Sequence, residues 1–171
     1  VPHTLAGSPK DRQPTNQNAL NPTFFRFYLH RVPAVTYFCQ SVNLPGLSIE
    51  PIDQDTYFTS ARHPYSKPSY EDLNINFIVD EDMVNWREIY DWMKSISNKD
   101  DFIEFVGNDS DHFSDATLSI LTSGMNANVE VTFKNCFPIS LGGVNFDSSV
   151  TEMESMTSEV TLAFDSYEVK K

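Results

Sequence analysis

The chain has 171 residues, enough for one domain with a hydrophobic core and too few for two large ones. Its 24 acidic and 12 basic residues give a formal net charge of −12, which argues against a protein that holds nucleic-acid phosphates through clustered Lys and Arg. Thirteen Phe and seven Tyr within a hydrophobic content of 40% are typical of a packed, strand-rich protein and exclude a disordered one.

The N-terminal segment differs from the rest of the chain. Residues 1–22 are polar and aperiodic, so they are expected to form a flexible arm ahead of one β domain at 23–171. Residues 1–22 lack the apolar region of a secretory signal, and no stretch of the chain approaches the roughly 18 apolar residues of a membrane span. A protein made in the cytosol, without a membrane partner, is therefore expected.

The first part of the β domain alternates between strand and turn signals. Segment 23–31 alternates apolar and polar residues, and 34–44 is rich in aromatic and β-branched residues, so the two are predicted to form a β-hairpin. Pro45 and Gly46 suit the central positions of a type II turn. Segment 47–70 has three prolines and little periodicity, which predicts a projecting extended loop without regular structure.

A strand and a helix are expected next. Segment 72–79 alternates apolar and polar residues, which predicts a strand. Segment 80–96 has three- and four-residue apolar spacing behind Asp80, a residue that favours a helix start. The apolar stripe expected to pack on the sheet includes Trp86, Tyr90 and Met93.

The last part of the chain is predicted to be β again. Strands are expected at 101–105, 116–123, 128–135, 137–148 and 158–169, the second and third of them joined as a hairpin. The predicted fold class is therefore mainly β, a small β-barrel or sandwich with one packed helix and a long extended loop.

Residues able to carry chemistry are sparse and scattered. Cys39 and Cys136 show no CxxC or Cys/His spacing and are interpreted as buried or half-buried thiols. None of the four histidines is paired with another at ligand spacing; they are His3, His30, His63 and His112. Because phosphate-binding loops and nucleophile motifs are also absent, no enzyme activity and no cofactor are expected.

One acidic segment partly resembles a calcium loop. Asp109 and Asp111 have the alternation of calcium ligands, but Phe113 occupies the third ligand position. The turn glycine and the distal Glu are missing as well, so a solvated acidic loop is the preferred interpretation and no metal site is predicted.

Five segments in this order resemble a known family. They are Val42–Gly46, Leu73–Glu81, Ile89–Trp92, Thr132–Pro138 and Val160–Tyr167. Their order and spacing, over about 23–169, resemble those of the tail-tube proteins of contractile-tailed bacteriophages, which are related to the inner-tube proteins of type VI secretion and tailocins.

The resemblance implies a structural subunit of a virion tail, assembled in the host cytoplasm. Six copies would form a ring, and stacked rings would form a channel for phage DNA, with the tail sheath and the baseplate or terminator proteins as further partners. An acidic protein suits a lumen along which phosphates slide without binding. Segment 47–70 corresponds to the extended arm of the family, so its interface candidates are Ile49, Pro51, Tyr57, Phe58, Arg62, His63 and Tyr65.

Two alternatives to the main tube protein stay open. A baseplate tube initiator or a tube terminator has the same fold, and the polar arm at 1–22 departs from the short helical start usual in tube proteins. A standalone β-sandwich binding module, with 47–70 as its recognition loop, would be distinguished by remaining a monomer in solution.

Overall fold

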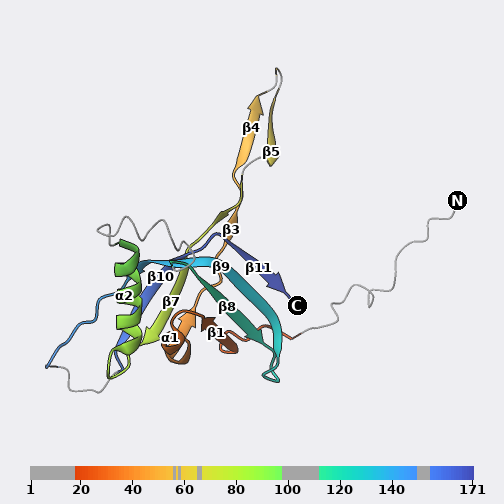
Figure 1. The fold of residues 1–171 in the computed structure, drawn as a ribbon. Coiled ribbons are helices and arrows are strands. Elements are labelled where there is room, and N and C mark those ends of the chain that lie inside the picture. The colour runs from red at the N-terminus through yellow and green to blue at the C-terminus, as the bar shows by residue number, and fades with distance from the viewer. Residues whose placement is uncertain (1–17, 56, 58, 65–66, 98–111, 150–154) are drawn as a thin grey trace.

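The computed structural model describes the fold of residues 18–55, 57, 59–64, 67–97, 112–149 and 155–171. These residues are mainly β, with one seven-stranded sheet, two small two-stranded sheets and two helices (Figure 1). The predicted fold class is confirmed, although a second, short helix joins the expected one. The strand predicted at 101–105 lies outside the described residues, and among the described residues no helix is long and apolar enough to cross a membrane.

Four antiparallel strands form the first layer of the body. In spatial order they are β1 (Phe25–Leu29), β8 (Ser114–Leu121), β9 (Ala127–Leu141) and β11 (Ser166–Lys170). Phe27 and Leu29 are buried whereas Arg26 and Tyr28, which alternate with them, are exposed. One face of this layer therefore covers the core and the other faces solvent, as period-two alternation requires.

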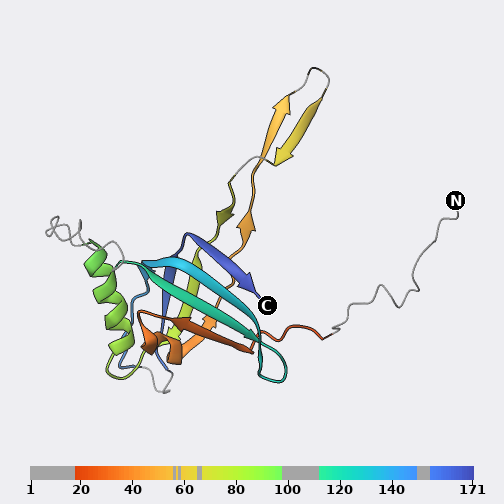
Figure 2. The ribbon, with the colours of Figure 1, turned by 45° about the vertical axis from the view of Figure 1, so that its right-hand side comes forward.

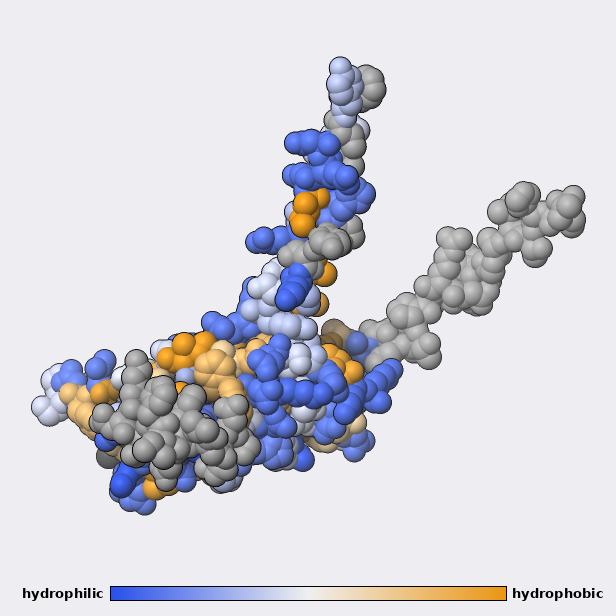
Figure 3. Space-filling model, turned by 45° about the horizontal axis from the view of Figure 1, so that its top comes forward, coloured by the Kyte–Doolittle hydropathy of each residue, from blue (hydrophilic) through white to orange (hydrophobic). Residues whose placement is uncertain are grey.

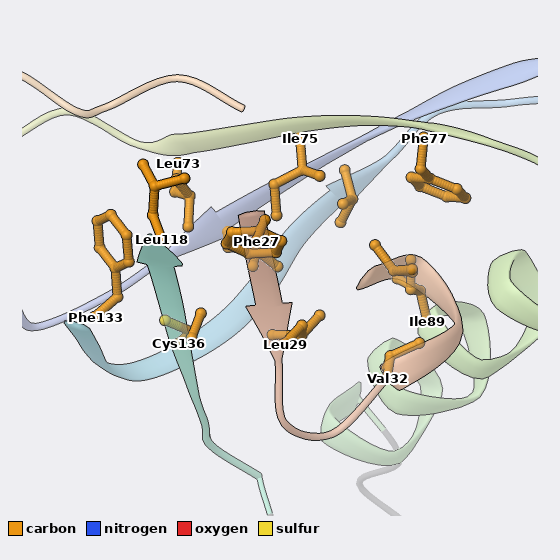
Figure 4. Packing of buried hydrophobic residues seen from close by; sticks show 14 of the residues in the cluster. Phe27, Leu29, Val32, Leu73, Ile75, Phe77, Ile89, Leu118, Phe133 and Cys136 are labelled. Atoms are coloured by element: carbon orange, nitrogen blue, oxygen red, sulfur yellow. The ribbon is translucent and has the colours of Figure 1, made fainter. Parts of the chain in front are cut away.

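The second layer continues from the C-terminal part of β9. It adds β10 (Thr157–Ala163), β7 (Leu73–Ile78) and β2 (Cys39–Val42), all paired antiparallel. Leu73, Ile75 and Phe77 of β7 are fully buried. Figure 4 shows them turned toward Phe27 and Leu29 of the first layer, so the core lies between the two layers.

The predicted strand at 34–44 is wrong over its first part. Helix α1 (Pro33–Phe38) occupies that part, and only β2 follows as a strand. Proline at the first turn suits a helix start, and Val35 is fully buried, so tertiary packing outweighs the β-propensity of the Val and Thr residues here. The predicted hairpin is also wrong, because β1 pairs with β8 and β2 pairs with β7.

The expected helix is α2 (Val84–Ser97), and its start is fixed by Asp80. The Asp80 carboxylate accepts hydrogen bonds from the backbone N–H groups of Val84 and Asn85, at 3.2 and 3.1 Å. The inward face, however, differs from the predicted stripe: its buried side chains are Asn85, Ile89 and Trp92.

The predicted inward stripe of α2 is rotated relative to the true one. Trp86 and Met93 are partly buried at the margin of the core, but Tyr90 is 46% exposed. The Tyr90 ring lies on the outer side, stacked on Trp86 with 5.5 Å between ring centroids. The sequence predicts the helical period of α2 but not its phase, because Asn85 is polar although it faces inward.

Segment 47–70 projects from the body as predicted, but as two successive β-ladders and not as an irregular loop. At its base β3 (Leu47–Ser48) pairs with β6 (Ser69–Tyr70). Farther out β4 (Pro51–Asp55) pairs with β5 (Ser60–Pro64). Figures 1 and 2 both show this segment extending away from the two layers. From here on, 'the arm' means segment 47–70 and not the polar residues 1–22.

The C-terminal strands follow a different division from the predicted one. The segments predicted as 128–135 and 137–148 are joined in a single strand, β9, in which Asn135 has a positive φ of 56°, and the strand ends at Leu141, short of the predicted end. The long strand predicted at 158–169 is instead two strands, β10 and β11. Both pair with β9, on its C-terminal and N-terminal parts, so β9 joins the two layers.

Candidate assembly surfaces

The base of the arm is held to the body by backbone and aromatic contacts. The backbone N–H of Gly46 donates to Glu71 Oε2 and the Glu71 N–H donates to the Gly46 carbonyl, both at 3.1 Å. Tyr70 lies against Tyr167 and Phe164, with ring centroids 5.2 and 5.7 Å away. Tyr167 also donates its hydroxyl to the carbonyl oxygen of Pro45 at 3.4 Å. The arm is therefore anchored on β11 and on the β10–β11 connection.

Beyond its base, no described side chain of the arm belongs to the buried core cluster. Its apolar side chains are exposed, with Ile49 at 54%, Ile52 at 49% and Tyr57 at 95%. Figure 3 shows a largely hydrophilic arm with small hydrophobic patches along it. Exposed apolar side chains on a projecting hairpin are typical of a surface that contacts another chain.

The predicted interface residues are distributed along this arm. Pro51, Arg62 and His63 lie on the outer ladder, and all three are exposed. Arg62 forms an exposed ion pair with Asp53 at 3.3 Å, across the ladder. Phe58 and Tyr65 lie outside the described residues. A role for these residues in an interface stays a prediction.

The first layer has two strand edges available for pairing. Within the described residues β1 pairs only with β8, and β11 pairs only with β9. Successive strands of the layer are antiparallel, and their number is even, so β1 and β11 run in opposite directions. Unpaired edges of this kind are templates for pairing with another chain.

A groove of about 470 Å³ lies beside the β1 edge, between β1 and the α1–β2 segment. The N–H of His30 donates to the Asp115 carbonyl, and the N–H of Leu121 donates to the Phe24 carbonyl. The hydrogen-bonded positions of β1 toward β8 are therefore the even-numbered residues from Phe24 to His30. Antiparallel alternation then directs the N–H and C=O groups of Phe25 and Phe27 away from β8, toward this groove. The sequence pattern identified β1 as a strand but carried no signal that it lies at an edge.

The described residues offer little for catalysis. Burial raises the pKa of Cys39 to about 11, and burial together with the nearby Asp115 raises the pKa of Cys136 to about 12, so neither thiol is an activated nucleophile. Among the described residues no group of three His, Cys, Asp or Glu side chains could hold a metal ion. Asp109 and Asp111 of the acidic segment lie outside the described residues.

Solved structures with the same fold come from contractile injection systems. The sheath/tube terminator of PVC, an extracellular contractile injection system, in its extended state aligns with a TM-score of 0.67 at 18% identity, covering 91% of this chain and 99% of that one. The PVC sheath–tube complex aligns with a TM-score of 0.63 at 19% identity, covering 96% and 99%. At these identities the likeness establishes the fold.

A family model, with a sequence relative beside it, identifies the family, which the structural matches at these identities do not. The tail tube terminator protein of Enterobacteria phage T4 is 37% identical over 68 residues, and the match covers 38% of this chain and 39% of that protein. The chain thus spans about two fifths of the length of this curated relative. The model of the phage tail tube protein family matches residues 15–170, nearly the whole chain. The resemblance found in the sequence is confirmed, and the chain belongs to the phage tail tube protein family.

Proposed function

We propose that the chain is a structural subunit of a phage tail tube, which forms six-membered rings that stack around a channel for the phage DNA. The observation that carries this proposal is that β1 and β11, the oppositely directed edge strands of one four-stranded layer, pair with no further strand among the described residues. The number six comes from the family resemblance.

The two edges are suited to a head-to-tail interface. Rotation about a ring axis leaves the component of each strand's direction along that axis unchanged, so β11 of one copy would meet β1 of the next in the antiparallel sense. Such an interface joins two different surfaces, and a rotation that closes makes a ring. The groove beside β1 provides space for the incoming strand, and closure would remove both exposed edges.

The arm is proposed to join one ring to the next. It extends well beyond the two layers, and its exposed Ile52 and Tyr57 have no part in the core (Figure 2). In a stack, such an arm reaches a neighbouring ring and would bury these side chains there. The outer surface of the stack would contact the tail sheath, and its ends the baseplate or terminator proteins.

Electron microscopy and native mass spectrometry of the purified protein, over a series of concentrations, test the ring. The expected result is six-membered rings with a central hole, which lengthen into tubes as concentration rises. A protein that stays monomeric at every concentration, also in the presence of preformed baseplate or tube ends, would contradict the proposal and favour a standalone binding module.

A second candidate role is the tube terminator, favoured by the identity with the phage T4 terminator over 68 residues. A terminator ring caps a tube and does not add further copies of itself. In the same experiment, single rings that bind tube ends but never stack with each other would assign this role. Self-assembled long tubes would assign the main tube role instead.

A further inference from the structure

The solvent face of the first layer has an unusual charge balance for this chain. Its charged side chains are three basic and three acidic ones: Arg26, Lys134, Lys170, Asp115, Glu130 and Glu168. The net charge of the face is therefore zero, whereas the whole chain carries −12. The excess of acid lies on other surfaces of the molecule.

Strand register interleaves these charges. Arg26 lies opposite Ser119, Ser119 opposite Glu130, and Glu130 opposite Lys170, in one row across four strands. Directly opposed residues of antiparallel strands share a face and lie within contact distance, so Glu130 separates the positive charges of this row.

Glu168 lies between Lys134 and Lys170 and offsets one of their two positive charges. It accepts a hydrogen bond from Lys134 Nζ on β9, and its second oxygen lies 3.8 Å from Lys170 Nζ. The hydrogen bond and charge of Lys134, and then the charge of Lys170, hold the pKa of Glu168 below its usual value. Glu168 is therefore ionised at neutral pH and sits between two lysines.

The location of this face in a ring follows from the proposed head-to-tail pairing of β1 and β11, on which the present inference rests. A layer continued from copy to copy forms a closed wall. The second layer and the helices cover one side of that wall, so the interleaved face would line the channel.

We propose that this face is the surface along which duplex DNA passes, and that Glu168, paired with Lys134 and Lys170, together with Glu130 opposite Lys170, prevents it from binding the DNA. Clustered lysines bind phosphates with release of counterions. In a ring, several copies would contact one duplex at once, which raises the overall affinity. A lysine paired with a carboxylate cannot release a counterion in this way. The wall is thus non-adhesive through charge pairing, and not through an excess of acid.

The test compares Glu168→Gln with Glu159→Gln, an exposed glutamate on β10 in the other layer. Preformed rings of each variant are mixed with a labelled linear duplex, and binding is followed by fluorescence anisotropy. Wild-type and Glu159→Gln rings are expected to bind the duplex only weakly. Glu168→Gln rings are expected to bind it roughly tenfold more tightly than either, with an affinity that falls steeply between about 50 and 200 mM salt.

Two further samples make the result specific. Replacing both lysines as well, in Lys134→Gln/Lys170→Gln/Glu168→Gln, should abolish the gained binding. A covalently closed circular duplex cannot thread a closed ring, so preformed Glu168→Gln rings should bind linear DNA and not circular DNA.

Each alternative result has one meaning. Equal DNA binding by the Glu168→Gln and Glu159→Gln rings would overturn the neutralising role of Glu168. Equal binding of linear and circular DNA would overturn the placement of this face in the channel. Absence of rings from the wild-type protein, seen by electron microscopy before DNA is added, would instead overturn the proposed function.

Discussion

At the scale of single residues, helix α2 has one buried aromatic side chain, Trp92, and one exposed aromatic side chain, Tyr90. Trp92 is 2% exposed, donates its indole N–H to the His112 carbonyl at 3.0 Å, and lies 5.2 Å from the Arg31 guanidinium. We expect Trp92→Ala to lower the free energy of unfolding by about 3–5 kcal/mol, because it removes a buried ring and leaves a cavity.

The matched control on the same helix is Tyr90→Ala. Tyr90 is 46% exposed and its ring stacks on Trp86, so a loss of only about 0.5 kcal/mol is expected. Urea unfolding followed by circular dichroism measures both. Equal losses for the two variants would mean that α2 does not present Trp92 to the core.

The thiols provide a second residue-scale prediction, for pH dependence. Because the pKa of Cys39 is about 11 and that of Cys136 about 12, both are protonated at pH 8, and the reactive thiolate is roughly a thousandth or less of each. We expect the folded protein to react slowly with a disulfide reagent at pH 8, Cys136 most slowly since it is fully buried. Reaction of Cys136 before unfolding, at the rate of a free thiol, would contradict this burial.

At the scale of elements, the arm is expected to be separable from the core. Replacing residues 49–68 by Asn-Gly keeps the β3–β6 pairing, with Ser48 opposite Ser69 across a two-residue hairpin turn. The melting temperature should stay within a few degrees, because none of the removed side chains that the structure describes belongs to the buried cluster.

Assembly is expected to respond differently from stability to this replacement. Rings should still form, since the edges of β1 and β11 are intact, but stacking into tubes should be lost. Light scattering and electron microscopy at matched concentrations measure both steps. Tubes of normal length from the shortened protein would show that the arm is not the contact between rings.

The elements also show what a sequence can and cannot predict here. Strand β7 and the β8–β9 hairpin were predictable because alternation and turn residues are local signals. Helix α1 was not, since its Val35 and Tyr37 favour strands in isolation and the helix depends on burial of Val35.

The candidate site was predictable only as a segment. Three prolines and weak periodicity indicated that 47–70 projects, but its ladders depend on pairing over distances that no local pattern encodes. The edges of β1 and β11 were not predictable, because edge position is a property of the completed sheet order. The phase of α2 was missed because Asn85 is buried through a hydrogen bond to the Ile78 carbonyl, at 2.7 Å.

At the scale of the whole molecule, the proposed ring predicts the largest oligomer that cross-linking of neighbouring copies can produce. Opposed positions of a β1–β11 junction share a face, so cysteines at Arg26 on β1 and Glu168 on β11 should lie within reach of a short bismaleimide. In a Cys39→Ser background, the double variant Arg26→Cys/Glu168→Cys should link into a ladder of oligomers that ends at six.

The single variants decide between a head-to-tail junction and a two-fold one. A head-to-tail contact joins different surfaces, so neither Arg26→Cys nor Glu168→Cys alone has a partner thiol to link with. A two-fold contact would join a surface to itself, and one of the single variants would then form dimers while the double variant would not grow to six. Denaturing electrophoresis after brief reaction distinguishes these patterns. A ladder that continues past six without ending would mean that the edges pair but the rotation between copies does not close, giving a filament of copies instead of the ring that a tail tube needs.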